Sequence, residues 1–109
     1  MQQINGTISE IFDINFVTPQ FRVREFVIEN KNNSEHSELI KFELTQDCCD
    51  FINDMAVGDN VNVFFTIKGR KCMCRDGIER YFNSLRAWTV IKTKQNLTLI
   101  FNPTDKTNG

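Results

Sequence analysis

The stretch LIKFELTQDCCDFINDMAVGDNVNVFFTIKGR, residues 39–70, decides the fold because its apolar spacing changes twice along its length. Apolar and polar residues alternate over Leu39–Gln46, where Ile40, Phe42 and Leu44 share one face. The alternation returns over Val61–Arg70, and there the apolar face consists of Val61, Val63, Phe65 and Ile67. A period of two is typical of strands that bury one face of an antiparallel sheet. The stretch therefore predicts two half-buried strands with an interruption between them.

The interruption predicts a short helix over residues 46–55. Its apolar residues recur at helical rather than alternating spacing, and they are Cys48, Cys49, Phe51, Ile52 and Met55. Side-chain oxygens at Thr45, Gln46 and Asp47 could cap its start, and Gly58 follows its end. We expect Cys49 to pack in the core and Cys48 to lie near the surface.

Period-two patterns predict three further strands, over residues 3–14, Arg22–Glu29 and Tyr81–Lys92. In the last of these the residues in phase are Leu85, Ala87, Thr89 and Ile91. In the first, the apolar step shifts near Ser9, which predicts a β-bulge there. Two stretches predict loops: 15–20, which contains Pro19, and 30–37, which is polar throughout and rich in turn-forming residues.

The predicted order is three strands, a helix and two strands. This is the order of a five-stranded OB-fold Greek-key barrel with one short helix between strands 3 and 4, in which closure removes exposed sheet edges. We expect five antiparallel strands to close on themselves within a domain spanning residues 1–93. Residues 94–109 would then form a C-terminal extension, with a candidate sixth strand over Leu97–Phe101 followed by a flexible tail.

The bulk composition bounds the class of protein. A chain of 109 residues with 40% hydrophobic content supports one globular domain. No apolar run approaches the roughly 20 residues that span a bilayer, and the start MQQINGTISE does not resemble a secretory signal. We therefore expect a cytoplasmic protein without a membrane partner, whose four cysteines are thiols.

Charge is distributed unevenly along the chain, although the net charge is only −1. Residues 1–65 carry four basic and eleven acidic groups, whereas residues 66–92 carry seven basic and two acidic groups. Such an asymmetry is typical of a protein with one electropositive face. The alternative is that the basic residues only solvate a pair of strands.

Short motifs resemble a known family. The run Val57-Gly58-Asp59-Asn60-Val61-Asn62-Val63, with Gly69-Arg70 after it, resembles the fourth strand of bacterial single-stranded-DNA-binding-protein-like OB domains. The run Glu25–Glu29 resembles their second strand, and Tyr81–Trp88 resembles the fifth strand of a short bacterial and phage family of the same layout. The resemblance covers about residues 4–92. It implies an OB barrel that binds single-stranded DNA, with a role in DNA replication or recombination.

Binding a single strand requires cations that follow the phosphates and exposed aromatic side chains on which bases stack. The segment from Lys68 to Arg86, with its turn at 74–78, offers the cations where such folds grip oligonucleotides. Phe16 and Phe21 lie at loop edges and are further candidates for stacking. The predicted nucleic-acid-binding residues are Arg22, Arg24, Phe64, Lys68, Arg70, Lys71, Arg75, Arg80, Tyr81, Arg86 and Trp88.

Each aromatic candidate has an alternative role. Trp88 could pack in the core, Phe64 could lie under the helix or in an interface between copies, and Phe16 and Phe21 could close the barrel mouth. For Arg22 and Arg24, solvated surface is the alternative to a ligand face.

Metal binding and catalysis have little support in the sequence. An adjacent pair, Cys48-Cys49, and a Cys72-x-Cys74 motif do not match the ligand spacing of structural zinc sites, so we predict no metal and no cofactor. The single histidine, His36, lies in a polar stretch, and we expect no enzymatic activity.

The sequence therefore predicts a protein that binds single-stranded nucleic acid with low sequence specificity. DNA is the favoured ligand and RNA the alternative. The rival hypothesis is a protein–protein interaction adaptor on the same barrel, since fold does not fix function. Assembly into a homo-oligomer is compatible with either.

Overall fold

The computed structural model describes residues 1–33 and 36–93. Its elements, in chain order, are β1 (Gln2–Ile11), β2 (Asn15–Thr18), β3 (Phe21–Asn33), β4 (His36–Thr45), the 3₁₀ helix η1 (Gln46–Ile52), β5 (Asn60–Met73) and β6 (Glu79–Lys92). The predicted strand over 97–101 lies outside the described residues.

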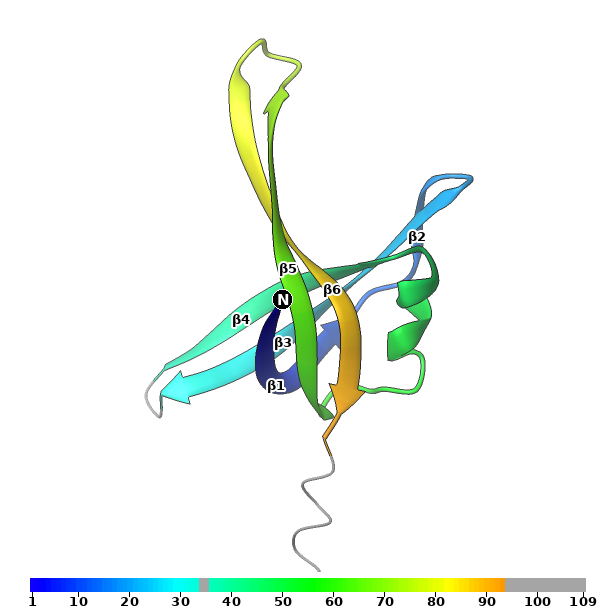
Figure 1. The fold of residues 1–109 in the computed structure, drawn as a ribbon, viewed down its shortest axis with the longest axis vertical. Helices are drawn as coiled ribbons and strands as arrows, with labels where there is room; N and C mark the ends of the chain where they lie inside the picture. Colours follow the sequence, from blue (N-terminus) through cyan, green and yellow to red (C-terminus); the bar gives the residue numbers. More distant parts are fainter. Residues whose placement is uncertain (34–35, 94–109) are drawn as a thin grey trace, which may run out of the picture.

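Five of the six strands close into a barrel (Figure 1). The strand order is β1-β5-β6-β4-β3, and β1 pairs with β3 as well as with β5, which completes the ring. The predicted OB-fold barrel is confirmed, with the helix between its third and fourth strands, here β4 and β5. The expectation of wholly antiparallel pairing is wrong at one seam, because β4 and β6 pair in parallel through Glu43 and Arg86. Both strands run in the same direction along that seam.

The core fills the barrel with side chains from every barrel strand and from η1. Phe26 and Phe42 stack with ring centroids 5.5 Å apart, and Phe65 meets Phe42 edge-on at 5.1 Å. The alternation in β4 and in the first half of β5 predicts the buried positions of Phe42 and Phe65 correctly. The predicted bulge in β1 is confirmed, because its register with β3 shifts between Ile8 and Glu10.

Both predicted loops are shorter than expected. Asn15–Thr18 is the strand β2, which pairs with the start of β3 at the open edge of the sheet and leaves all four of its residues exposed. An edge hairpin has no buried face, so its residues need not alternate in polarity. The second predicted loop, 30–37, is largely absorbed because β3 continues to Asn33 and β4 begins at His36.

The predicted helix over 46–55 is confirmed in place but is a 3₁₀ helix that ends at Ile52. With three residues per turn, Cys49 and Ile52 fall on one side and are buried, while Phe51 is exposed. The prediction that the side chain of Thr45 caps the helix is wrong, because that side chain makes no cap hydrogen bond. Gln46 has a φ of 52°, and its side chain instead accepts from the backbone N–H of Arg22 and donates to the carbonyl of Gln20.

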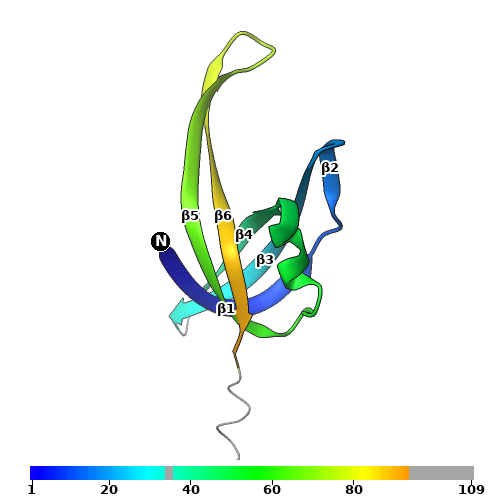
Figure 2. The same cartoon turned by 45° about the vertical axis from the view of Figure 1, so that its right-hand side comes forward.

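The β5–β6 hairpin extends well beyond the barrel, as Figure 2 shows from a second side. Val61, Val63 and Phe65 are buried, but Ile67 is 59% exposed because β5 has left the barrel there. The expectation that Ile67 joins the core is therefore wrong. A register shift at Phe64/Phe65 leaves Trp88 as an extra residue in β6, so that Ala87 and Val90 are buried and Ile91 is exposed.

Candidate nucleic-acid interface

The projecting hairpin ends in a tight turn that fixes its register. The carbonyl of Cys74 accepts from the N–H of Gly77 at 2.9 Å, and the N–H of Cys74 donates to the carbonyl of Ile78 at 3.0 Å. Gly77 has a φ of 82°, which suits the last residue of a three-residue hairpin loop. From this turn the pairing runs unbroken to Phe65, so the positions of the hairpin side chains follow directly from the turn.

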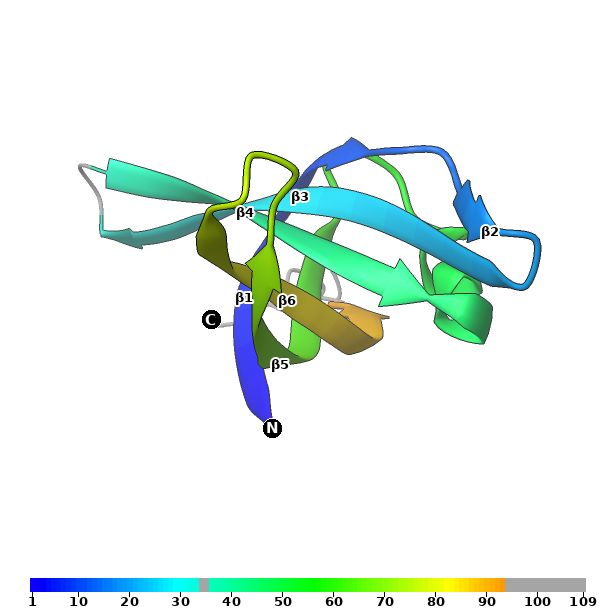
Figure 3. The ribbon, with the colours of Figure 1, turned by 90° about the horizontal axis from the view of Figure 1, so that it is seen from above.

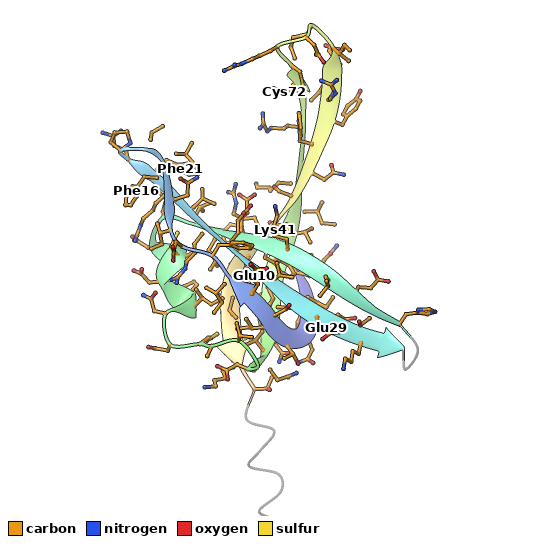
Figure 4. All side chains as sticks on the ribbon, turned by 180° about the vertical axis from the view of Figure 1, so that it is seen from behind. Glu10, Phe16, Phe21, Glu29, Lys41 and Cys72 are labelled. Atoms are coloured by element: carbon orange, nitrogen blue, oxygen red, sulfur yellow. The ribbon has the colours of Figure 1, made fainter. Side chains whose placement is uncertain are left out.

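A groove of about 470 Å³ lies where the hairpin rises beside β3 and β4. We call it the hairpin groove. Its lining residues come from both hairpin strands, from β4 and from the start of β3, and they are Phe21, Glu43, Lys68, Gly69, Arg70, Phe82, Asn83, Ser84 and Arg86. Figure 4 shows the two arms that flank this region, with Phe16 and Phe21 on the β2–β3 arm and Cys72 on the hairpin. Seen from above, β3 and β4 run together past the hairpin to the end where β2 lies (Figure 3).

The predicted cations of the hairpin divide into paired and unpaired groups. Arg80 forms a two-point ion pair with Asp76, the shorter contact being 2.8 Å, and Lys71 lies 3.7 Å from Glu79. Arg86, nearer the barrel, lies 3.3 Å from Glu43. Within residues 1–33 and 36–93, no carboxylate lies within ion-pair distance of the other predicted hairpin cations, which are Lys68, Arg70 and Arg75. These three are the cations best placed to contact phosphates.

Each face of the hairpin carries one cation beside one aromatic ring. Arg70 lies over Phe82 at 5.6 Å from the ring centroid, on the face that lines the hairpin groove. Lys71 lies over Tyr81 at 5.9 Å on the opposite face. Both pairs join residues directly opposite each other in the register. Such pairs hold the cation and the ring together at the surface.

Sequence reasoning missed Phe82, which is 43% exposed in the hairpin groove. The sequence contained enough information to find it. Counting outward along both strands from a turn centred on Asp76 places Phe82 directly opposite Arg70. Sequence reasoning also missed Glu43, which reaches the groove from β4. No local pattern predicts that contact, since it depends on the β4–β6 seam.

Arg22 and Arg24 are not brought together with the hairpin cations. They share the phase of the buried Phe26 on β3 and therefore point to the side that η1 covers. Arg22 lies 3.5 Å from Asp47 and 3.6 Å from Asp50, and Arg24 donates to Asn53 and to the carbonyl of Phe12. Their contacts hold the helix and the β1 end against β3.

Phe64 and Trp88 also lie outside the hairpin groove. Phe64 is half-buried on the barrel wall opposite Gln3 of β1. Trp88 is 46% exposed, and its indole N–H donates to the hydroxyl of Thr66 at 3.0 Å. Packing of Trp88 in the core, one of the two roles considered for it, does not occur. Phe16 is exposed on β2, whereas Phe21 lines the groove.

Between the hairpin and the β2–β3 arm lies the outer surface of β3 and β4, which we call the floor. It carries paired opposite charges and is not a continuous basic surface. Glu25 and Glu43 lie opposite each other on β3 and β4. Lys41 contacts Glu25 at 3.3 Å, and Arg86 contacts Glu43 at 3.3 Å. Arg86 is thus a partly buried member of an ion pair at the barrel seam, and its Nε has no hydrogen-bond partner among the described residues. The positive character of the site is concentrated on the hairpin.

The hairpin tip has its own acid–base pair. The hydrogen bond from the Arg80 guanidinium, with a second from the backbone N–H of Ile78, lowers the pKa of Asp76 below its ordinary value of 3.8. The same contact raises the pKa of Arg80. Asp76 is therefore ionised at neutral pH, and its ion pair with Arg80 competes with any phosphate for the Arg80 guanidinium.

The cysteines lie in two places. Cys49 lies on the buried side of η1, where desolvation raises the pKa of its thiol, and Cys72 and Cys74 lie half-buried near the hairpin tip. Among residues 1–33 and 36–93, no three His, Cys, Asp or Glu side chains gather in a metal-binding arrangement. The same residues contain no helix long and apolar enough to cross a membrane.

Known proteins resemble this one at two levels. Two crystal structures of Rim1, a mitochondrial single-stranded DNA binding protein from S. cerevisiae, each superpose with a TM-score of 0.66 at 16% identity, over 85% of this chain and 93% of Rim1. A likeness at that identity concerns the fold, and it agrees with the expected barrel. No protein with a curated description matches the sequence. One family model matches residues 3–91, and the chain therefore belongs to the family described as Domain of unknown function (DUF3127).

Proposed function

We propose that this protein binds single-stranded DNA, without catalysis, through the hairpin groove and the adjoining hairpin tip. The observation that carries the proposal is the juxtaposition of Arg70 and Phe82 in the hairpin groove, with Lys68 beside them and Arg75 at the tip. Cations contact phosphates, and aromatic rings stack on bases, which is the pair of contacts that single-strand binding requires. The fold shared with Rim1 supports the proposal at the level of architecture.

Binding should show little dependence on overall sequence, since phosphate contacts and stacking do not read base edges. It should also be modest in strength, because few cations are free of carboxylate partners. Replication and recombination are the processes in which such a binder would act.

The experiment is a fluorescence anisotropy titration of labelled oligo-dT at two salt concentrations. Phe82→Ala should weaken binding by about fivefold or more, because stacking on one base contributes about 1–3 kcal/mol. Trp88→Ala is the matched control, since Trp88 is similarly exposed but lies outside the groove, and should change affinity less than about twofold. Absence of binding at low salt would contradict the proposal.

A second candidate function, a protein–protein interaction adaptor, is favoured by one further observation. The hairpin also exposes Ile67, Met73 and Ile78, each more than half exposed. Exposed apolar residues on a projecting element are typical of protein contact surfaces. If oligo-dT does not bind at low salt, the hairpin is better explained as a protein-binding arm, and an Ile67→Ser, Met73→Ser variant tests that role.

A further inference from the structure

Glu43 is the only acid among the described residues that line the hairpin groove. Its side chain is 22% exposed and that of its partner Arg86 is 30% exposed, so both can be reached from the groove. Arg86 contacts Oε1 of Glu43 at 3.3 Å, and no other hydrogen-bond partner of this carboxylate occurs among residues 1–33 and 36–93. One carboxylate oxygen is therefore available to a ligand.

The position of Glu43 sets the orientation of a strand bound in the groove. A carboxylate repels phosphates, whereas Lys68 and Arg70 on the hairpin wall attract them. The sugar-phosphate backbone should therefore follow the hairpin, and the bases should turn toward β4. Phe21 and Phe82 line the same groove and can stack against a base of any kind.

The base edge that meets Glu43 must offer hydrogen-bond donors, because a carboxylate only accepts. Single-stranded bases expose their Watson–Crick edges. Guanine presents two adjacent donors there, N1–H and the N2 amino group, and its O6 is an acceptor suited to the neighbouring Arg86 guanidinium. Thymine presents one donor between two carbonyl oxygens, which a carboxylate repels.

We infer that Glu43, held by Arg86 at the floor of the hairpin groove, makes this site prefer a guanine base. The inference rests on the proposed single-strand binding and adds a base-selective position to it. Glu43 acts as a specificity-determining residue here, while affinity comes from the hairpin cations and the aromatic side chains.

The test compares three oligonucleotides of about 12 nucleotides, within the range of site sizes of an OB fold. One is all thymidine, one has a single central deoxyguanosine, and one has deoxyinosine in that place. The guanine oligonucleotide should bind about fivefold more tightly than oligo-dT, which is about 1 kcal/mol and the lower end for a bidentate base contact. Inosine lacks the N2 amino group and should lose most of this gain.

Two variants assign the preference to one residue. Glu43→Gln should reduce the guanine-to-thymine ratio to about one, whereas Glu25→Gln, which removes the same charge from the opposite position on β3, should preserve it. Equal binding of the guanine and thymine oligonucleotides by the parent protein would overturn the inference and leave the proposed function intact. Loss of the preference in Glu25→Gln would overturn the assignment to Glu43. If Glu43→Gln does not fold, the inosine comparison on the parent decides. Binding of none of the oligonucleotides at low salt would refute the proposed function itself.

Discussion

Replacing Lys68, Arg70 and Arg75 together with Gln removes the hairpin cations that have no carboxylate partner within residues 1–33 and 36–93. All three residues are exposed, and none forms part of an ion pair there that the change would break. Exposed substitutions of this kind usually alter the free energy of unfolding by less than about 0.5 kcal/mol each. The variant should therefore fold, and its effect on binding can be attributed to the lost charges.

The expected magnitude follows from counterion release. Each phosphate contact on a single strand changes the logarithm of affinity by about 0.7 per log unit of salt, so three contacts give a slope of about −2. Between 0.05 and 0.2 M salt the parent should lose about 15-fold in affinity, and the variant should lose little. At 0.05 M salt the two proteins should differ by two to three orders of magnitude when all three contacts form together, roughly 0.9 of a decade per contact.

The assay is fluorescence anisotropy of labelled oligo-dT across a salt series. Plots of log affinity against log salt for the parent and the hairpin variant should converge toward 1 M salt. The control replaces Lys31, Lys41 and Lys92 with Gln, which removes the same net charge from β3, β4 and the far end of β6. This control should keep the parent slope within about 0.7 of its value. If it flattens the slope as much as the hairpin variant does, overall charge and not the hairpin governs binding. An unchanged slope in the hairpin variant would refute the assignment of phosphate contacts.

Asp76→Asn keeps an acceptor for the turn but releases Arg80, so oligo-dT should bind more tightly and its salt slope should steepen by about 0.7. In the parent, the lowered pKa of Asp76 means that its contribution to the stability of the turn is present above the ordinary value of 3.8 and is lost as the pH falls below it; an NMR titration of the carboxyl carbon checks this. Gly6→Ala should cost about 1–3 kcal/mol in urea unfolding, because a Cβ there would lie 2.8 Å from the carbonyl oxygen of Glu29. Gly69→Ala is the control and should stay within about 0.5 kcal/mol of the parent, since its nearest atom is a side-chain oxygen at 3.3 Å.

The sequence predicts the barrel well where one face of a strand is buried along its length. In β4 and the lower half of β5, alternation identifies Phe42, Leu44, Val61 and Val63, all of which are essentially inaccessible to solvent. Alternation fails where the burial that produces it ends. Ile67 keeps the phase of the core but lies beyond the barrel, and no property of the residue itself marks that boundary.

The sequence identifies the cations of the candidate site, but it does not identify the carboxylates that pair with them. The basic residues of the hairpin are visible in the charge pattern, but that pattern does not show that Arg80 and Lys71 contact Asp76 and Glu79. The bulge that makes Trp88 an extra residue in β6 could not be predicted from the sequence either. A bulge changes the phase of a strand, but no characteristic residue type marks its position.

The closure of the barrel determines what the hairpin can bind. Because β4 and β6 meet at Glu43 and Arg86, the floor beneath the hairpin carries paired opposite charges instead of a continuous basic surface. In the proposed binding mode, the hairpin wall attracts phosphates whereas the paired charges of the floor do not, so the bases of the strand should face the floor. The carboxylates of Asp76 and Glu79 compete with phosphates for two of the five cations between Lys68 and Arg80. A single copy should therefore bind reversibly and release DNA readily as salt rises, and the balance between free and paired cations on one hairpin sets that response.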